Sequence, residues 1–123
     1  MYTLDTNAII YCLKKDDRAV IAIQNILAQN VPIYISTITE LELFGYPNLT
    51  AEEAGLIEML LETFSIIPVD SRIARIAGSL RRSHRIKTLD AAIAATALST
   101  GSILLTRNIK DFQRIPNLKI SEV

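Results

Sequence analysis

The fold class is decided by the stretch at residues 88–106, TLDAAIAATALSTGSILLT. Its first part predicts an alanine-rich helix from Leu89 to Ser99, with Thr88 as the N-cap and Gly101 as the stop. The apolar run Ile103–Thr106 follows at once, and unbroken apolar runs are typical of strands buried on both faces of a parallel sheet. A buried helix next to a buried strand indicates an α/β fold.

The rest of the chain repeats this alternation. Its strand candidates are Tyr2–Leu4, Ile33–Ser36, Ile66–Val69, which Pro68 places early or at an edge, and the weaker Leu118–Ile120. Helical patterns separate them, and one begins at a capping box of Thr50 and Glu53. There is no Asn-Gly or Asp-Gly hairpin signal. The sequence predicts one domain over residues 1–123, a three-layer α/β/α fold with a central, mainly parallel sheet.

Composition excludes several classes of protein. Hydrophobic residues make up 50% of the 123 residues and charged residues 21%, so the chain is not disordered. With Cys12 and His84 as its only cysteine and histidine, it has neither an internal disulfide nor a Cys/His zinc site. No apolar run approaches the ~20 residues that span a bilayer. We expect a cytoplasmic protein without a membrane partner.

The formal charge is zero, with 13 basic and 13 acidic residues, which argues against a nucleic-acid binder that is basic throughout. The charges are nevertheless separated along the sequence. Between Glu40 and Glu62 there are six acids and no base, whereas six of the 13 bases lie between Arg72 and Lys87.

Candidate chemistry lies where the predicted strands end. Ligands of open parallel sheets bind beyond the carboxyl ends of the strands, and polar residues occur there in the groups Asp5-Thr6-Asn7 and Thr106-Arg107-Asn108. Asp111 follows the second group, and Glu42 and Asp90 lie near the starts of predicted helices. Each acid also has a plain structural interpretation: a helix cap for Asp5 or Asp111, a charge that stabilises a helix dipole for Asp90, and a surface charge for Glu42 or its neighbour Glu40.

If these four acids converge, their repulsion raises carboxylate pKa values unless a cation neutralises them. Hard oxygen ligands without His or Cys favour Mg²⁺ or Mn²⁺, which activate water and stabilise displacement at phosphorus. Glu40 lies two residues from Glu42 and so points to a different helical face. The sequence has no GxSxG, P-loop or GxGxxG motif. A phospho-receiver-like domain with Asp70 as phosphate acceptor is an alternative function, but this chain lacks the paired acids and the lysine expected of such a site.

Four segments resemble the PIN domains of small VapC-type ribonuclease toxins, in the same order along the chain. They are YTLDTNAI at 2–9, ISTITELELFG at 35–45, TLDAAIAATAL at 88–98 and LLTRNIKDF at 104–112. The resemblance puts metal-binding acids on Asp5, Glu42 and Asp90. Many relatives carry an aspartate where this chain has Asn108, so a fourth carboxylate would come from Asp111.

The resemblance implies a metal-dependent endoribonuclease, dimeric and silenced by a cognate antitoxin. Thr6, Asn7, Thr106 and Asn108 would position water, metal or phosphate, while Arg107 or the run from Arg81 to Lys87 would hold RNA. The segment Glu52–Phe64, acidic and leucine-bearing, is a candidate surface for the homodimer or the antitoxin. A catalytically inactive PIN fold that binds RNA or a protein partner is the alternative.

Overall fold

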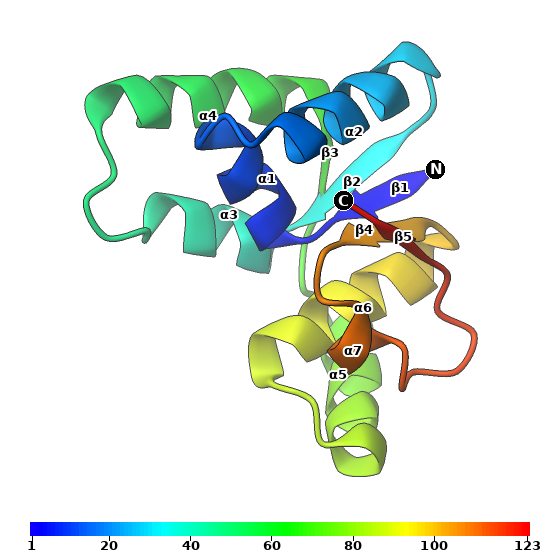
Figure 1. The fold of residues 1–123 in the computed structure, drawn as a ribbon. Helices are drawn as coiled ribbons and strands as arrows, with labels where there is room; N and C mark the ends of the chain where they lie inside the picture. The colour runs from blue at the N-terminus through cyan, green and yellow to red at the C-terminus, as the bar shows by residue number, and fades with distance from the viewer.

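Five parallel strands form the central sheet of the computed structural model, which describes all residues 1–123 (Figure 1). In chain order the strands are β1 (Tyr2–Leu4), β2 (Ile33–Ser36), β3 (Ser65–Ile67), β4 (Ile103–Thr106) and β5 (Ile120–Glu122). Their order in the sheet is β3-β2-β1-β4-β5. The chain therefore moves outward from β1 to one side and later returns to its other side, so that β1 and β4 meet where the strand order reverses.

Seven helices connect the strands. They are α1 (Thr6–Leu13), α2 (Asp17–Ala28), α3 (Thr37–Phe44), α4 (Ala51–Thr63), α5 (Ser71–His84), α6 (Thr88–Thr100) and α7 (Ile109–Phe112). In Figure 1, α1, α2 and α4 lie on one side of the sheet, and α5, α6 and α7 lie on the other. The predicted three-layer α/β/α architecture is confirmed, and its sheet is parallel throughout.

Each face of the sheet carries its own apolar core. Successive residues of β4 point to opposite faces, so Leu105 packs with Leu4 and Ile9 on the α1 side while Leu104 packs with Ile93 on the α6 side. Residues 91–97 of α6 are all buried, as the apolar sequence predicts. This double coverage explains why the strands read as continuous apolar runs.

Several local predictions are confirmed. Pro68 directly follows β3, which is an edge strand, and Thr50 and Glu53 form a capping box at the start of α4. Asp70 precedes an apolar helical pattern, which predicts an N-cap, and it caps α5 by accepting a 2.9 Å hydrogen bond from the Ile73 amide. Gly101 ends α6 with a φ of 66°, a left-handed conformation that suits glycine.

Other predictions are wrong in detail. The N-cap of α6 is Lys87, and Thr88 is the first helical residue. The apolar residues after Asp90 predict that this helix begins inside the domain, but Leu89 remains 39% exposed and full burial begins only at Ala91. The last strand is Ile120–Glu122, two residues later than predicted, since it pairs in register with Leu104–Thr106 of β4. None of the helices is long and apolar enough to cross a lipid bilayer.

Candidate metal centre

Asp5 is the most deeply buried of the four predicted acids. It directly follows β1, is 3% exposed and lies at the N-cap position of α1. Its side chain makes no capping hydrogen bond; instead Oδ2 accepts a 2.8 Å hydrogen bond from Thr106 Oγ1 at the end of β4. The capping interpretation of this carboxylate therefore does not describe its contacts, and its place at the junction of β1 and β4 is the position where parallel sheets bind ligands.

The surroundings of Asp5 favour its protonated form. Burial raises its pKa from an ordinary 3.8 to about 6, the Thr106 hydrogen bond opposes this rise, and the negative charges of Asp90 and Glu42 add to it. Asp5 belongs to neither of the two ion pairs in the structure. It is thus a buried acid that lacks a basic partner and lies within the electrostatic reach of two further acids.

Glu42 is held by the first turn of α1. Thr6 Oγ1 donates a 2.6 Å hydrogen bond to Glu42 Oε1 and lies 3.1 Å from Thr39 Oγ1. Thr39 lies one helical turn before Glu42 on α3, where the two side chains share a face. The charges that act on Asp5 and Asp90 include Glu42 and do not include Glu40, which agrees with the helical spacing.

Asp90 reaches the same region from the first turn of α6 and is partly buried. Burial raises its pKa, Lys87 opposes this rise, and Asp111 and Glu42 add to it. The four predicted acids therefore affect one another's pKa values. The charges of Asp111 and Glu42 raise the pKa of Asp90, and the charges of Asp90 and Glu42 raise the pKa of Asp5.

The fourth strand end is organised by Thr106 and Asn108. The backbone N–H of Asn108 donates a hydrogen bond to Thr106 Oγ1 at 3.0 Å. The hydroxyl proton of Thr106 is thereby left to donate to Asp5. Asn108 Nδ2 donates to Asp111 Oδ2 at 3.1 Å. Asn108 is the N-cap residue of α7, but its side chain makes no capping hydrogen bond. One short segment therefore orients both Asp5 and Asp111.

Arg107 points away from this group. Its guanidinium binds both carboxylate oxygens of Asp16, at 2.8 and 3.2 Å, and lies 4.1 Å from the ring centroid of Tyr11. Its Nε donates to the Val123 carbonyl at 3.0 Å. Through these contacts Arg107 connects the end of β4 with Tyr11 of α1, with Asp16 at the start of α2 and with the last residue of the chain. Nothing in the sequence identifies Asp16 as its partner, because 91 positions separate the two.

The four acids surround one region without closing into a coordination shell. As the side chains stand, no group of three or more His, Cys, Asp and Glu residues is arranged to hold a metal ion. The donor chemistry nevertheless fits a hard divalent cation, since every acid offers carboxylate oxygen and the buried Asp5 has no basic partner.

An open hollow of about 400 Å³ adjoins Glu42, one of these acids. Thr6, Asn7 and Glu42 form its polar rim, and its remaining lining is Ile10, Leu41, Gly45, Tyr46 and Pro47. Asn7 is exposed here and faces away from the core. No sequence pattern singles out Tyr46, which lies in the connection after α3, four residues beyond Glu42.

The sequence matches the PIN domain family over residues 2–118. It is 34% identical to Ribonuclease VapC1 of Haemophilus influenzae, covering 97% of this chain and 95% of that protein. It is 32% identical to Ribonuclease VapC2 of Rickettsia felis, covering 96% and 94%. The crystal structure of VapBC2 from Rickettsia felis, bound to a DNA fragment from its promoter, matches with a TM-score of 0.84 and 30% identity, covering 99% and 98%.

Proposed function

The chain belongs to the PIN domain family, and from this membership we propose that it is a metal-dependent endoribonuclease, the toxin of a toxin–antitoxin pair. Its relatives are named ribonucleases, and a VapBC complex shares its fold. We propose further that residues 1–123 act as one domain, because both apolar cores pack on the same sheet. We place its action in the cytoplasm, where RNA is available.

The observation that carries this proposal is the burial of Asp5 beside two further acids without a basic partner. An unpaired carboxylate in a protein interior costs free energy. A protein that needed only a helix cap there would be more stable with asparagine at this position. The unfavourable arrangement is explained if a divalent cation binds among the acids and neutralises their charges.

Asp5, Glu42 and Asp90 are the residues that would hold the ion, with Asp111 as a fourth carboxylate. We propose Mg²⁺ or Mn²⁺, because all the donors are hard oxygen atoms. When bound, such an ion lowers the pKa of water and stabilises negative charge on a phosphodiester in displacement. The chain's own hydroxyl groups prepare this site: Thr106 orients Asp5, and Thr6 orients Glu42.

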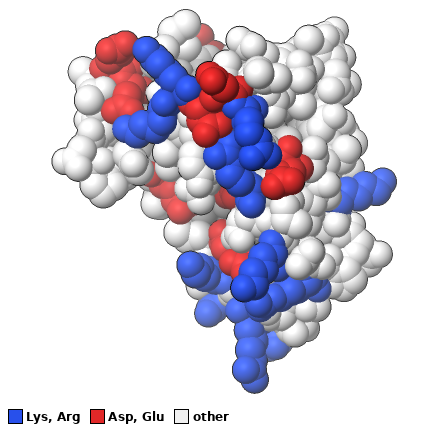
Figure 2. All heavy atoms as spheres, in the orientation of Figure 1, with Lys and Arg blue, Asp and Glu red and all other residues white.

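RNA would be held by a surface that we call the basic ridge. Its members are exposed and belong to α5 or to the turn that leads into α6: Arg72, Arg75, Arg81, Arg82, Arg85 and Lys87. The two ion pairs of the structure, Lys14–Glu53 and Arg107–Asp16, include none of them. Figure 2 shows basic side chains gathered over the α5–α7 end of the molecule, next to acidic ones. Unpaired bases of this kind bind phosphates without sequence preference.

One end of the ridge lies near the acids, because Lys87 is three residues before Asp90 and its charge lowers the pKa of that carboxyl. An RNA strand bound along it would lead its backbone to the candidate metal centre. Arg107 is left out of the substrate-binding set, since its guanidinium is occupied by Asp16 and Tyr11.

An antitoxin and a second copy of the chain are the proposed protein partners. A groove of about 360 Å³ lies between α1 and α4 and is lined by Cys12, Leu13, Leu56, Met59 and Leu60, among others. Met59 is 66% exposed and Leu56 is 41% exposed. The α4 side of this groove belongs to the segment Glu52–Phe64, and the groove would be covered by one of these partners.

The proposal is tested by incubating the purified protein with single-stranded and structured RNA, in Mn²⁺ or in chelator. We expect cutting in Mn²⁺ that chelator abolishes and that Asp5→Asn and Asp90→Asn reduce by at least ~100-fold. Cutting that survives chelator or both substitutions contradicts the mechanism. RNA binding without any cutting identifies an inactive RNA-binding PIN fold instead.

A further inference from the structure

The hollow beside the acids has a composition that the proposed metal chemistry does not need. Ile10, Leu41, Tyr46 and Pro47 give it an apolar and partly aromatic lining, and Leu41 is 65% exposed. No Lys or Arg lines it, so it lacks the charge that would attract a phosphate group. Its volume of about 400 Å³ is within the range of small-molecule sites, ~300–1,000 Å³. A flat, uncharged ring system fits this lining best.

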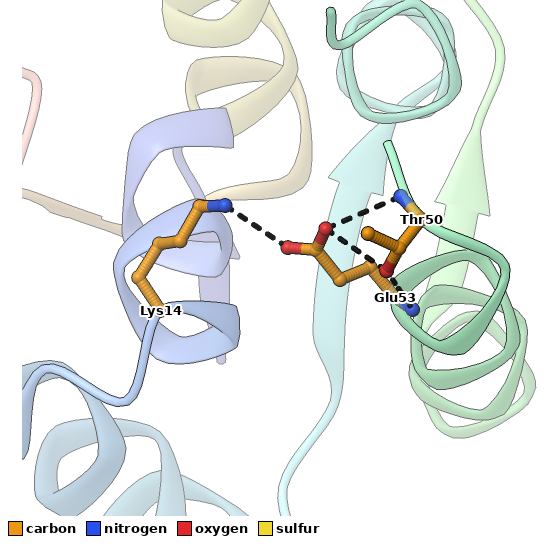
Figure 3. A network of polar contacts seen from close by, with 3 residues as sticks. All are labelled: Lys14, Thr50 and Glu53. Atoms are coloured by element: carbon orange, nitrogen blue, oxygen red, sulfur yellow. Dashed lines mark hydrogen bonds and ion pairs between the residues drawn. The ribbon is translucent and has the colours of Figure 1, made fainter. Parts of the chain in front are cut away.

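The aromatic wall of the hollow is held in place by a network that plays no part in the metal site. Lys14 Nζ lies 5.4 Å from the centroid of the Tyr46 ring. The same ammonium group donates to Glu53 Oε2 at 3.1 Å, and Glu53 is fixed in turn by its capping box with Thr50 (Figure 3). The ring of Tyr46 is therefore stabilised by a cation that α4 anchors.

Tyr46 also separates two spaces of different kinds. It lines the open hollow together with Asn7 and Glu42, and it lines a small, largely apolar cavity together with Lys14 and Glu53. Gly45 allows the chain to turn so tightly here, because a Cβ atom at this position would lie 3.0 Å from the Leu41 carbonyl oxygen. An anchored aromatic ring at the wall of an open hollow is a suitable platform for stacking.

We propose that this hollow receives one unstacked nucleobase of single-stranded RNA, next to the phosphodiester that is cut, with Tyr46 as the stacking platform. This inference rests on the proposed ribonuclease function. Proteins bind single-stranded RNA by stacking its bases on aromatic side chains. Because Thr6 and Glu42 belong to both the hollow and the acidic group, a base seated here places its own phosphate beside the carboxylates.

The test is a double-mutant cycle between the protein and the RNA. Short single-stranded RNAs, each with an abasic nucleotide at a different position, are bound to the catalytically silenced Asp90→Asn protein, with and without Tyr46→Leu. We expect one abasic position to weaken binding by about tenfold or more, the range for the loss of one base–aromatic stack. Tyr46→Leu should weaken binding of the intact RNA equally and should make that abasic position neutral.

Two variants serve as controls. Tyr46→Phe keeps the ring and should keep the full effect of the abasic position. Tyr34→Leu removes a tyrosine from β2, where its hydroxyl contacts Met1 Sδ at 3.6 Å, and should change neither binding nor the abasic profile. Equal losses at every abasic position, whether or not the protein carries Tyr46→Leu, overturn the inference, as does the absence of RNA binding. The ribonuclease function is judged separately, from cutting by the wild-type protein.

Discussion

Thr106 Oγ1 donates a 2.8 Å hydrogen bond to Asp5 Oδ2 across 101 positions of the sequence. The pairing of β1 with β4 makes this contact possible, since Leu4 and Leu105 are partners in register and the residues that follow them are Asp5 and Thr106. The backbone amide of Asp5 also donates to the Leu105 carbonyl at 3.1 Å. The sheet itself therefore sets the position of the most buried acid.

Removing the Thr106 hydroxyl should change both the stability of the protein and its pH dependence. The hydrogen bond lowers the pKa of Asp5, so Thr106→Val should raise that pKa and move the acidic limb of RNA cleavage to higher pH. Leaving a buried carboxylate without this donor should also cost about 1–3 kcal/mol of unfolding free energy. Thr106→Ser keeps the donor, and its pH–rate profile should match the wild type. An identical profile for the valine variant would show that the contact is not used.

Asp5 should destabilise the metal-free protein at neutral pH. Its pKa is about 6 in the folded state against an ordinary 3.8, so the folded protein binds the proton more tightly. The contribution of Asp5 to stability is therefore fully present below pH 3.8 and is lost as pH rises to about 6. A tenfold change in proton affinity is worth about 1.4 kcal/mol, so the loss is about 3 kcal/mol.

Asp5→Asn should remove this loss and make the metal-free protein more stable at pH 7. Urea denaturation in chelator at a series of pH values measures the difference. The matched control is Asp17→Asn, which removes an exposed acid at the start of α2. If Asp5→Asn is less stable than the wild type at pH 7, the ionised Asp5 carboxylate does not destabilise the metal-free fold.

Mn²⁺ should stabilise the wild-type protein against heat. Binding to the folded state alone contributes about 2.7 kcal/mol at a concentration of one hundred times Kd. We expect thermal unfolding to show this rise for the wild type and for Asp17→Asn, and to show none for Asp5→Asn or Asp90→Asn. A smaller rise in Asp111→Asn would identify Asp111 as a ligand, and an unchanged rise would exclude it.

The contact between Arg107 and Asp16 should act on stability and not on RNA binding. The Arg107 hydrogen bonds hold the pKa of Asp16 at about 2, below its ordinary 3.8. This pair therefore stabilises the fold above pH 3.8, and the contribution is lost as pH falls to about 2. Arg107→Gln should lower stability at pH 7 and reduce its fall in acid. A weaker RNA complex with a smaller salt dependence would instead make Arg107 a substrate residue.

Neutralising the basic ridge should weaken RNA binding in a way that depends on salt. Each lost phosphate contact to a single strand lowers the slope of log K against log salt concentration by about 0.7. Arg82→Gln with Arg85→Gln should therefore reduce the slope by about 1.4. The control is Lys15→Gln with Arg18→Gln, which removes two exposed bases near the start of α2. Equal slopes for the two double variants would remove the ridge from the RNA path.

The fold was predictable from the sequence because its signals are local. Apolar runs such as Ile103–Thr106, the capping box at Thr50 and the glycine stop at Gly101 depend only on neighbouring residues. Element boundaries that depend on pairing between distant segments were not predictable. The last strand lies two residues later than predicted because pairing with β4 fixes its register.

Candidate site residues could be found where they directly follow or end a strand, as Asp5 and Thr106 do. The contacts of these residues could not be predicted, because side chains far apart in the sequence come together only when the sheet forms. Arg107 is next to Thr106 but turns to Asp16, and Tyr46 contacts Lys14 at the end of α1, 32 positions away. No periodicity or motif carries that information.

Sharing of one divalent ion by Asp5, Glu42 and Asp90 can be observed directly in the anomalous difference density of crystals grown with Mn²⁺. We expect a Mn²⁺ peak within coordination distance of the Asp5 and Asp90 carboxylates, with Glu42 completing the set and no peak in Asp5→Asn crystals. Mn²⁺-saturated crystals with no density between these carboxylates would contradict it.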